Sequence, residues 1–228
     1  MNRNFTAFCA AMLAFAILLV VCGSYGIRNN SIALADGTDK AVYLTFDDGP
    51  SDRVTPTVLD VLKEENVKAT FFIIGRQAET RKYLIEREFK EGHTVAVHSY
   101  SHNYSLIYSS AQELLKDIDK CNKIIKEVTG SYSDLYRFPG GSYGVNKKLI
   151  SAVTEKGFRY VDWNASTRDA ELYEPTPYQL YKSTIATSAN AQKVVLLAHD
   201  STTKTATAAA LKDIIKYFKE NGYKFMTF

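Results

Sequence analysis

Short hydrophobic runs alternate with amphipathic stretches over most of this chain. The runs are rich in β-branched and aromatic residues, and they predict buried strands at 41–46, 69–74, 94–97, 135–138, 158–163, 194–198 and 223–228. The stretches between them predict helices at 54–65, 77–91, 110–128, 146–156, 176–189 and 204–221. Seven strands alternating with helices indicate an α/β fold, either a parallel (β/α) barrel or an open doubly wound sheet. Periodicity alone does not choose between the two.

The amino-terminal segment has a different pattern. From Phe5 to Cys22 there is no charged residue, proline or glycine, and Arg3 precedes the run. Its length lies between that of a signal-peptide core and the roughly 20 residues of a membrane-spanning helix. We therefore expect a membrane anchor or signal peptide over 1–22, a polar linker over 23–39 and one folded domain over 40–228. Both interpretations of the segment export the domain.

Composition and charge narrow the class of partner. The chain has 228 residues and a formal net charge of +3, and its lysines are dispersed along the sequence. So small a charge gives no support for nucleic-acid binding, and we expect a monomer without a nucleic-acid partner. Cys9 and Cys22 lie in the apolar segment, which leaves Cys121 as the single cysteine of the domain. No disulfide is therefore expected within the domain.

Candidate chemistry gathers where predicted strands end, which is where parallel α/β proteins assemble their sites. His98 and His102 stand four residues apart directly after a strand, and T-F-D-D-G-P, which contains Asp48, closes another. Two histidines and one carboxylate can bind a divalent metal ion and leave positions open for water and substrate. Neighbouring side chains on an extended segment point in opposite directions, so one of Asp47 and Asp48 can bind the metal while the other stays free to act as a base. Taken alone, D-D-G-P is better explained as a plain turn after a strand.

Two further strand ends carry groups suited to acyl transfer. Arg137 ends a predicted strand, and its guanidinium can hold a carboxylate ionised and oriented; its simpler interpretation is a surface ion pair. The glycines of the P-G-G sequence that follows expose peptide N–H groups able to stabilise an oxyanion. His199 follows V-V-L-L-A and can protonate a leaving amine if an acid nearby keeps it charged. His93 is expected to be a core histidine.

These motifs occur in an order that resembles the polysaccharide deacetylase family, also called carbohydrate esterase family 4 or the NodB homology domain. They are T-F-D-D-G-P, H-S-Y-S-H, R-F-P-G-G, a segment around Asp169, and L-A-H, which ends at His199. The resemblance spans about 40–228 and implies an incomplete seven-stranded (β/α) barrel. It also implies hydrolysis of N-acetyl groups on a polysaccharide that contains N-acetylglucosamine, peptidoglycan or a chitin-like glycan. The expected location is the outer face of the cell membrane or the cell wall.

The resemblance assigns roles to the residues of the metal site. Asp48, His98 and His102 would bind one divalent ion, zinc by preference, although two histidines and an aspartate also suit cobalt, nickel or iron. Ser99 would steady the metal loop by a hydrogen bond. Asp47 would be the general base.

The resemblance also assigns the residues around the base. Arg137 would orient Asp47, and His199 would be the general acid, tuned by Asp169. The N–H near Gly140 would stabilise the oxyanion, and Leu197 would line the pocket for the acetyl methyl group.

Two positions depart from the family pattern. Gly140 stands where the third motif usually carries an aromatic residue, and Asp169 is followed by alanine where tryptophan is common. Tyr143 and Trp163 are candidates to restore an aromatic surface for the sugar, although Trp163 at a strand end is equally a core residue. Asp162 is a rival of Asp169 as the partner of His199.

Two other functions fit the same motifs. Metal, base and oxyanion donor serve an ester as well as an amide, so the chain can also be an O-acetyl esterase on xylan or another surface polysaccharide. A catalytically inactive wall-binding module is the alternative from a different class. Retention of base, ligands and acid together argues against it, because binding alone does not need them.

Overall fold

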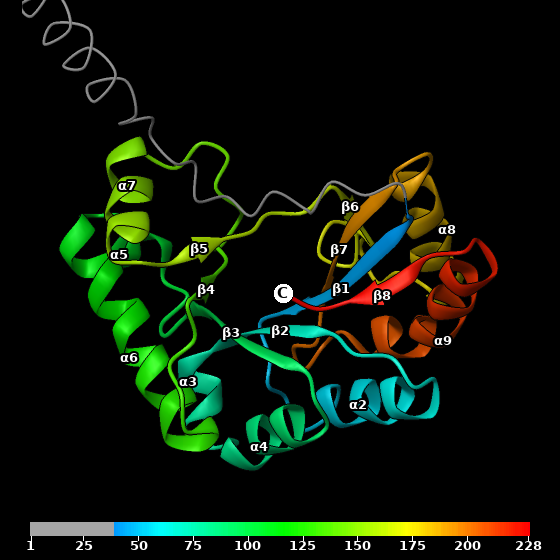
Figure 1. Ribbon diagram of the computed structural model, residues 1–228, viewed down its shortest axis with the longest axis horizontal. Coiled ribbons are helices and arrows are strands. Elements are labelled where there is room, and N and C mark those ends of the chain that lie inside the picture. Colours follow the sequence, from blue (N-terminus) through cyan, green and yellow to red (C-terminus); the bar gives the residue numbers. More distant parts are fainter. Residues whose placement is uncertain (1–38) are drawn as a thin grey trace, which may run out of the picture. The chain divides into compact units, whose positions relative to one another are not determined.

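The computed structural model describes residues 39–228, which form the folded domain (Figure 1). The predicted anchor or signal peptide at 1–22, and all but the last residue of the predicted linker at 23–39, lie outside the described residues. Among the helices of residues 39–228, none has the length and apolar character needed to cross a bilayer.

One parallel sheet curls into an open barrel along the order β5-β4-β3-β2-β1-β7-β6, with β8 paired to β1 outside this path. The strands are β1 (Ala41–Asp47), β2 (Thr70–Ile74), β3 (Thr94–Ser99), β4 (Leu135–Tyr136), β5 (Arg159–Tyr160), β6 (Ala165–Ser166), β7 (Lys193–His199) and β8 (Lys224–Met226). β5 and β6 are the two ends of the path, and no pairing between them closes the ring. The structure therefore confirms the predicted incomplete seven-stranded barrel.

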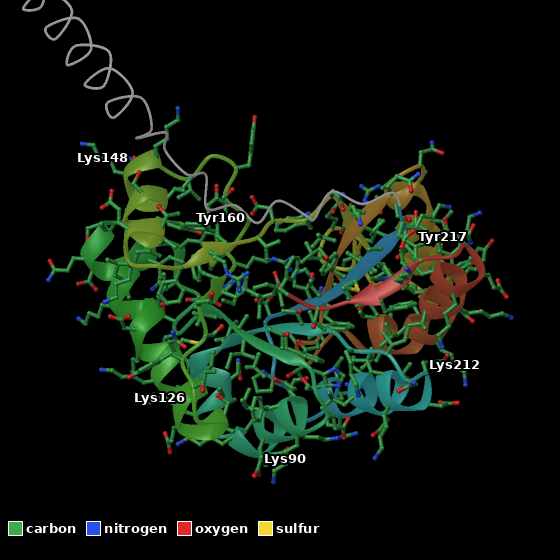
Figure 2. All side chains as sticks on the ribbon, viewed as in Figure 1. Lys90, Lys126, Lys148, Tyr160, Lys212 and Tyr217 are labelled. Carbon is green, nitrogen blue, oxygen red and sulfur yellow. The ribbon has the colours of Figure 1, made fainter. Side chains whose placement is uncertain are left out.

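Helices cover the outside of the sheet (Figure 1). They are α2 (Thr55–Glu64), α3 (Gly75–Ala78), α4 (Lys82–Lys90), α5 (Tyr104–Ile107), α6 (Ala111–Thr129), α7 (Lys147–Glu155), α8 (Pro177–Ser188) and α9 (Thr205–Glu220). Their polar faces point to solvent, as Figure 2 shows for Lys90, Lys126, Lys148 and Lys212. This separation of faces explains why the lysines are dispersed along the sequence.

The structure differs from the prediction at β6, at β8 and in the helix at 77–91, and it adds the short helix α5, which was not predicted. β6 was not predicted, and it takes the edge position of the path, whereas the predicted last strand is β8. β8 pairs with Ala41–Tyr43 at the start of β1, whereas β2 pairs with Thr45–Asp47 at the end of β1. The single helix predicted at 77–91 is divided into α3 and α4. The break falls at Arg81, which has φ −131° and forms an ion pair with Asp52 instead of continuing the helix.

The side chains of each strand alternate between two packed layers. Those that point outward meet the helices in the large core, and each fully buried one contributes about 1.5–3 kcal/mol relative to exposure. Those that point inward form a small cluster of Phe72, Ala96, Leu135, Val161 and Val195, joined by Tyr43, Trp163 and Phe228. The inward position nearest the carboxyl end of four strands carries a polar residue: Asp47, His98, Arg137 and His199. The barrel interior is thus apolar along most of each strand and carries polar side chains at the carboxyl ends of the strands.

Candidate active site

Asp48, His98 and His102 bring three potential metal ligands together at the carboxyl ends of β1 and β3. Asp48 and His102 both adopt left-handed backbone conformations, with φ 73° and 50°, which turn the chain sharply after each strand. Asp48 Oδ1 lies 3.5 Å from His98 Nε2 and 3.4 Å from His102 Nε2. The potential ligand atoms all lie within 4.8 Å of one another.

The donor set fits a divalent cation on two observations. Asp48 Oδ1 is buried and has no hydrogen-bond partner in the described chain, and such an orphaned carboxylate oxygen is costly unless a cation or donor meets it. Burial lowers the pKa of His98 to about 3, against the opposing charge of Asp48, so the imidazole is neutral and able to donate a lone pair. His98 Nδ1 lies 2.9 Å from the carbonyl oxygen of Arg137. This contact orients the imidazole ring so that its Nε2 points toward Asp48 and His102.

A buried carboxylate on α6 holds the loop between His98 and His102 in shape. Ser99 Oγ donates to Asp117 Oδ1 at 2.6 Å and accepts from the His102 N–H at 2.8 Å. Asp117 also accepts from the backbone N–H groups of Tyr100 and Ser101, at 2.6 and 2.9 Å. Ser99 therefore makes the bond predicted for it, whereas Asp117 was missed. An acidic residue on the buried face of α6, between Leu114 and Cys121, was the available signal.

Replacing Asp117 by asparagine should weaken metal binding about 10–100-fold, as loss of a group that orients ligands commonly does. The asparagine oxygen can accept the hydrogen bonds now made to one carboxylate oxygen, but the NH₂ group in place of the other oxygen would face a backbone N–H donor. Competition with a fluorescent zinc chelator would measure the dissociation constant. Asp119→Asn is the matched control, because Asp119 lies on the same helix and pairs with Lys156 at the surface. Equal affinities in the two variants would show that the carboxylate of Asp117 is dispensable.

Asp47 and Arg137 form a buried ion pair beside the ligand set. Arg137 Nη1 donates to Asp47 Oδ1 at 2.9 Å and to Thr45 Oγ1 at 2.7 Å. The other nitrogens of the guanidinium donate to the carbonyl oxygens of Val161 and Asp162, and its carbon lies 4.1 Å from the centroid of the Phe72 ring. A guanidinium held on every side fixes the carboxylate that it contacts.

The second oxygen of Asp47 faces the potential metal ligands. Asp47 Oδ2 lies 3.9 Å from His98 Nε2. Burial raises the pKa of Asp47 above its ordinary value, although the charge and hydrogen bond of Arg137 oppose the rise. A carboxylate with a raised pKa is a stronger base than an exposed one, and it is held at the edge of the ligand set.

His199 forms a second charged pair on the neighbouring strand, in register with Asp47. Its Nδ1 lies 2.7 Å from Asp169 Oδ1, and its backbone N–H donates to Asp169 Oδ2 at 2.8 Å. Burial opposes the charged imidazole, but the hydrogen bond and charge of Asp169 raise the pKa of His199 to about 9. Thr207 Oγ1 donates to Asp169 Oδ2 at 2.7 Å, and Lys204 Nζ donates to the Asp169 carbonyl at 2.7 Å.

Asp162, the rival partner of His199, points elsewhere. Its carboxylate accepts hydrogen bonds from the backbone N–H and hydroxyl of Ser142, and so braces the loop that follows Arg137. The structure therefore assigns the partnership with His199 to Asp169. The sequence left the question open because both aspartates follow short strands.

The backbone at Gly140 forms a tight turn at the mouth of the site. The Gly141 N–H donates to the Phe138 carbonyl at 2.8 Å, with Pro139 and Gly140 between them and Gly140 at φ 78°. Proline followed by a residue with positive φ is the signature of a type II turn, which needs glycine at the third position. Gly140 itself is exposed.

The other three residues predicted to contact substrate lie in different surroundings. Leu197 is buried in β7 between Thr45 and Ser166. Trp163 packs on the inner cluster, and its ring lies so close to Gly141 that a Cβ there would be 3.1 Å from it. Tyr143 projects fully into solvent. The structure thus gives Trp163 a packing role and leaves Tyr143 as the aromatic surface of the loop.

Comparison with known proteins shows the family. The family model described as "Polysaccharide deacetylase" matches residues 35–161, which include the first three motifs. The chain belongs to the polysaccharide deacetylase family. This membership confirms the family and the class of hydrolase predicted from the motifs.

Relatives and a solved structure extend the similarity. The Bacillus subtilis protein YheN, assigned by its name to the polysaccharide deacetylases, is 37% identical over 82% of this chain and 66% of its own length. A peptidoglycan-N-acetylglucosamine deacetylase of Bacillus cereus is 36% identical over 82% of this chain and 68% of its own. The catalytic domain of a peptidoglycan N-acetylglucosamine deacetylase from Eubacterium rectale superposes with a TM-score of 0.79 at 37% identity, covering 87% of this chain and 92% of that one. The chain spans about two thirds of the length of the two sequence relatives.

Proposed function

We propose that this polysaccharide deacetylase uses a divalent cation, zinc by preference, to remove N-acetyl groups from N-acetylglucosamine units of peptidoglycan or a chitin-like glycan. Two ion pairs beside the potential ligand set carry the proposal: Arg137–Asp47 and Asp169–His199. Asp47 and His199 lie on the neighbouring strands β1 and β7. One dyad offers a base and the other an acid, as hydrolysis of an amide requires.

The residues divide the reaction between them. Asp48, His98 and His102 would hold the cation, which supplies Lewis acidity that polarises the acetyl carbonyl and makes a water molecule more acidic. Asp47 takes a proton from the attacking water, while Arg137 keeps the carboxylate oriented. The exposed Gly140 N–H donates to the oxygen on which negative charge develops.

His199 completes the hydrolysis by giving a proton to the leaving nitrogen. Its pKa of about 9 keeps the imidazolium charged at neutral pH, so a proton is available there for the leaving nitrogen. Leu197 would form the wall against the acetyl methyl group.

The presence of this proton at neutral pH favours an amide over an ester as the substrate. An amine is a poor leaving group unless it is protonated, whereas an alcohol departs more readily. The Asp169–His199 dyad therefore supports N-deacetylation over the O-acetyl esterase alternative. The inactive wall-binding alternative leaves both dyads and the orphaned Asp48 oxygen without a purpose.

The cellular setting is part of the proposal. An anchor or signal peptide at 1–22 would place the domain at the outer face of the membrane or in the cell wall, where such glycans occur. The polar linker at 23–39 would let a monomeric domain reach along the polymer.

A substrate panel tests this function. The protein, purified without chelator, should contain one divalent ion per chain and should release acetate from peptidoglycan or N-acetylglucosamine oligomers faster than from acetylated xylan. Chelation should abolish release, and zinc should restore it. Acetate released only from xylan would establish the esterase instead, and a protein free of metal yet fully active would refute the metal site.

A further inference from the structure

A cavity of about 330 Å³ opens directly beside the ligand set. α5, which follows His102, forms one wall, and the turn at Gly140 with the loop beyond it forms the other. The residues of its lining that carry the argument are Tyr104, Tyr108, Gly140, Tyr143 and Asn146. None of the residues around this cavity is acidic or basic, in contrast to the charged dyads next to it.

Tyr104 is the side chain that joins this cavity to the metal site. Its ring stands edge-on to the ring of His102, with centroids 5.3 Å apart and planes at 85°. The Tyr104 side chain is nevertheless about half exposed, at 47%. An aromatic ring fixed on one side by a metal-ligand histidine and open on the other offers a flat surface to a ligand.

Gly140 and Tyr104 occupy the space together. A Cβ at position 140 would lie 3.2 Å from the Tyr104 hydroxyl and 3.3 Å from the nearest ring carbon. Any side chain at 140 would therefore displace the ring. The glycine thus serves the turn, through its positive φ, and also admits an aromatic ring from another element.

Tyr108 locks the two walls together. Its hydroxyl donates to the Pro139 carbonyl at 2.7 Å, and its ring stands edge-on to Tyr104 with centroids 5.8 Å apart. Because C=O and N–H of one trans peptide point in opposite directions, the Gly140 N–H points away from Tyr108. Tyr108 therefore positions both the Gly140 N–H, which is the oxyanion donor, and the ring of Tyr104.

The lining indicates the chemistry of the ligand. Exposed tyrosine rings suit the apolar face of a pyranose, and the amide of Asn146 and the tyrosine hydroxyls suit its hydroxyl groups. The lack of acidic and basic side chains favours an uncharged ligand, because a charged group would be desolvated there without a partner. The volume of the cavity lies at the lower end of the range for small-molecule sites, as expected for a site that binds a single sugar ring.

We propose that this cavity binds an uncharged pyranose of the glycan next to the unit that loses its acetyl group, with Tyr104 as the stacking surface. The inference rests on the proposed function only for the identity of the polymer. Tyr104 then determines preference for oligomers over the isolated sugar.

Affinity for N-acetylglucosamine oligomers of one to four units tests the subsite. Isothermal titration would use the full-length, zinc-loaded protein carrying Asp47→Asn, so that the ligand is not consumed. Tyr104→Ala should weaken binding of the tetramer about tenfold, an amount typical of a lost aromatic contact, and leave the single sugar nearly unchanged. Tyr104→Phe should retain most of the affinity, because the ring and not the hydroxyl makes the contact.

Two further variants separate the subsite from a folding defect. Tyr143→Ala removes a fully exposed side chain on the opposite wall and should weaken the tetramer by a smaller factor. Tyr178→Ala, at another exposed tyrosine, on α8 (68%), should change nothing. Equal affinity of the tetramer for the parent and Tyr104→Ala, or equal loss for one and four units, would overturn the subsite. Failure of the proposed function has a different signature, since binding would still depend on length while the wild-type protein releases no acetate.

Discussion

Replacing Asp47 by asparagine is expected to lower the turnover of acetylated glycan about 10²–10⁴-fold while one divalent ion per chain stays bound. The amide cannot take a proton from water, yet its oxygen can still accept the hydrogen bond of Arg137. The guanidinium also keeps its contacts to Thr45 and to the carbonyl groups of Val161 and Asp162, so the domain should still fold. Acetate release gives the rate, and elemental analysis gives the metal content.

His98→Ala is the matched variant, and it should lose metal and activity together. It removes a potential ligand but leaves the hydrogen bond from Arg137 Nη1 to Asp47 Oδ1 in place. Asp52→Asn is the neutral control, because Asp52 lies at the surface and pairs with Arg81. The division of roles would be wrong if Asp47→Asn lost its metal, or if it kept wild-type turnover.

Asp169→Asn is expected to move the alkaline limb of the kcat profile from near pH 9 to about neutral pH or below, and to lower turnover at pH 8 about 10²-fold or more. His199 has a raised pKa, so its acid form is present below about pH 9 and is lost above it. Without the charge of Asp169, burial of the imidazole remains and now lowers the pKa. At pH 8 little of the histidine would then carry a proton for the leaving amine.

Asp162→Asn tests the specificity of this effect. Asp162 bonds to Ser142 and does not contact His199, so its replacement should leave the alkaline limb in place even if the loop is disturbed. Thr207→Val removes one hydrogen bond to Asp169 but keeps its negative charge, so it should move the limb far less than Asp169→Asn does. An unchanged limb in Asp169→Asn would show that another group controls the acid.

Much of the site could be predicted from the sequence because its residues sit at the ends of long strands. β1, β3 and β7 have clear apolar patterns, and Asp47, His98 and His199 follow directly from where those patterns stop. The candidate metal ligands could be grouped because parallel strands bring their carboxyl ends to one edge.

The remainder depended on contacts that no local pattern encodes. β6 has two residues, too few for a period, and it forms because the free edge of β7 accepts it: the Thr167 N–H donates to the Leu197 carbonyl at 3.0 Å. Asp117 acts from a helix remote in sequence from most of what it orders. Tyr104 lies just past a motif, and only the space above Gly140 reveals its position.

Four polar side chains point into the mouth of the barrel: Asp47, His98, Arg137 and His199. This shared orientation limits the insertions and deletions that the strands can tolerate during evolution. Deleting or inserting one residue within β1 would exchange its two faces, turning Asp47 into the helix layer and Phe46 into the barrel mouth. The same holds for β3 and β7. The loop segments beyond Asp48, His102, Gly140 and Asp169 carry no such constraint, so changes of length there can remodel the glycan-binding surface while the reaction centre keeps its geometry.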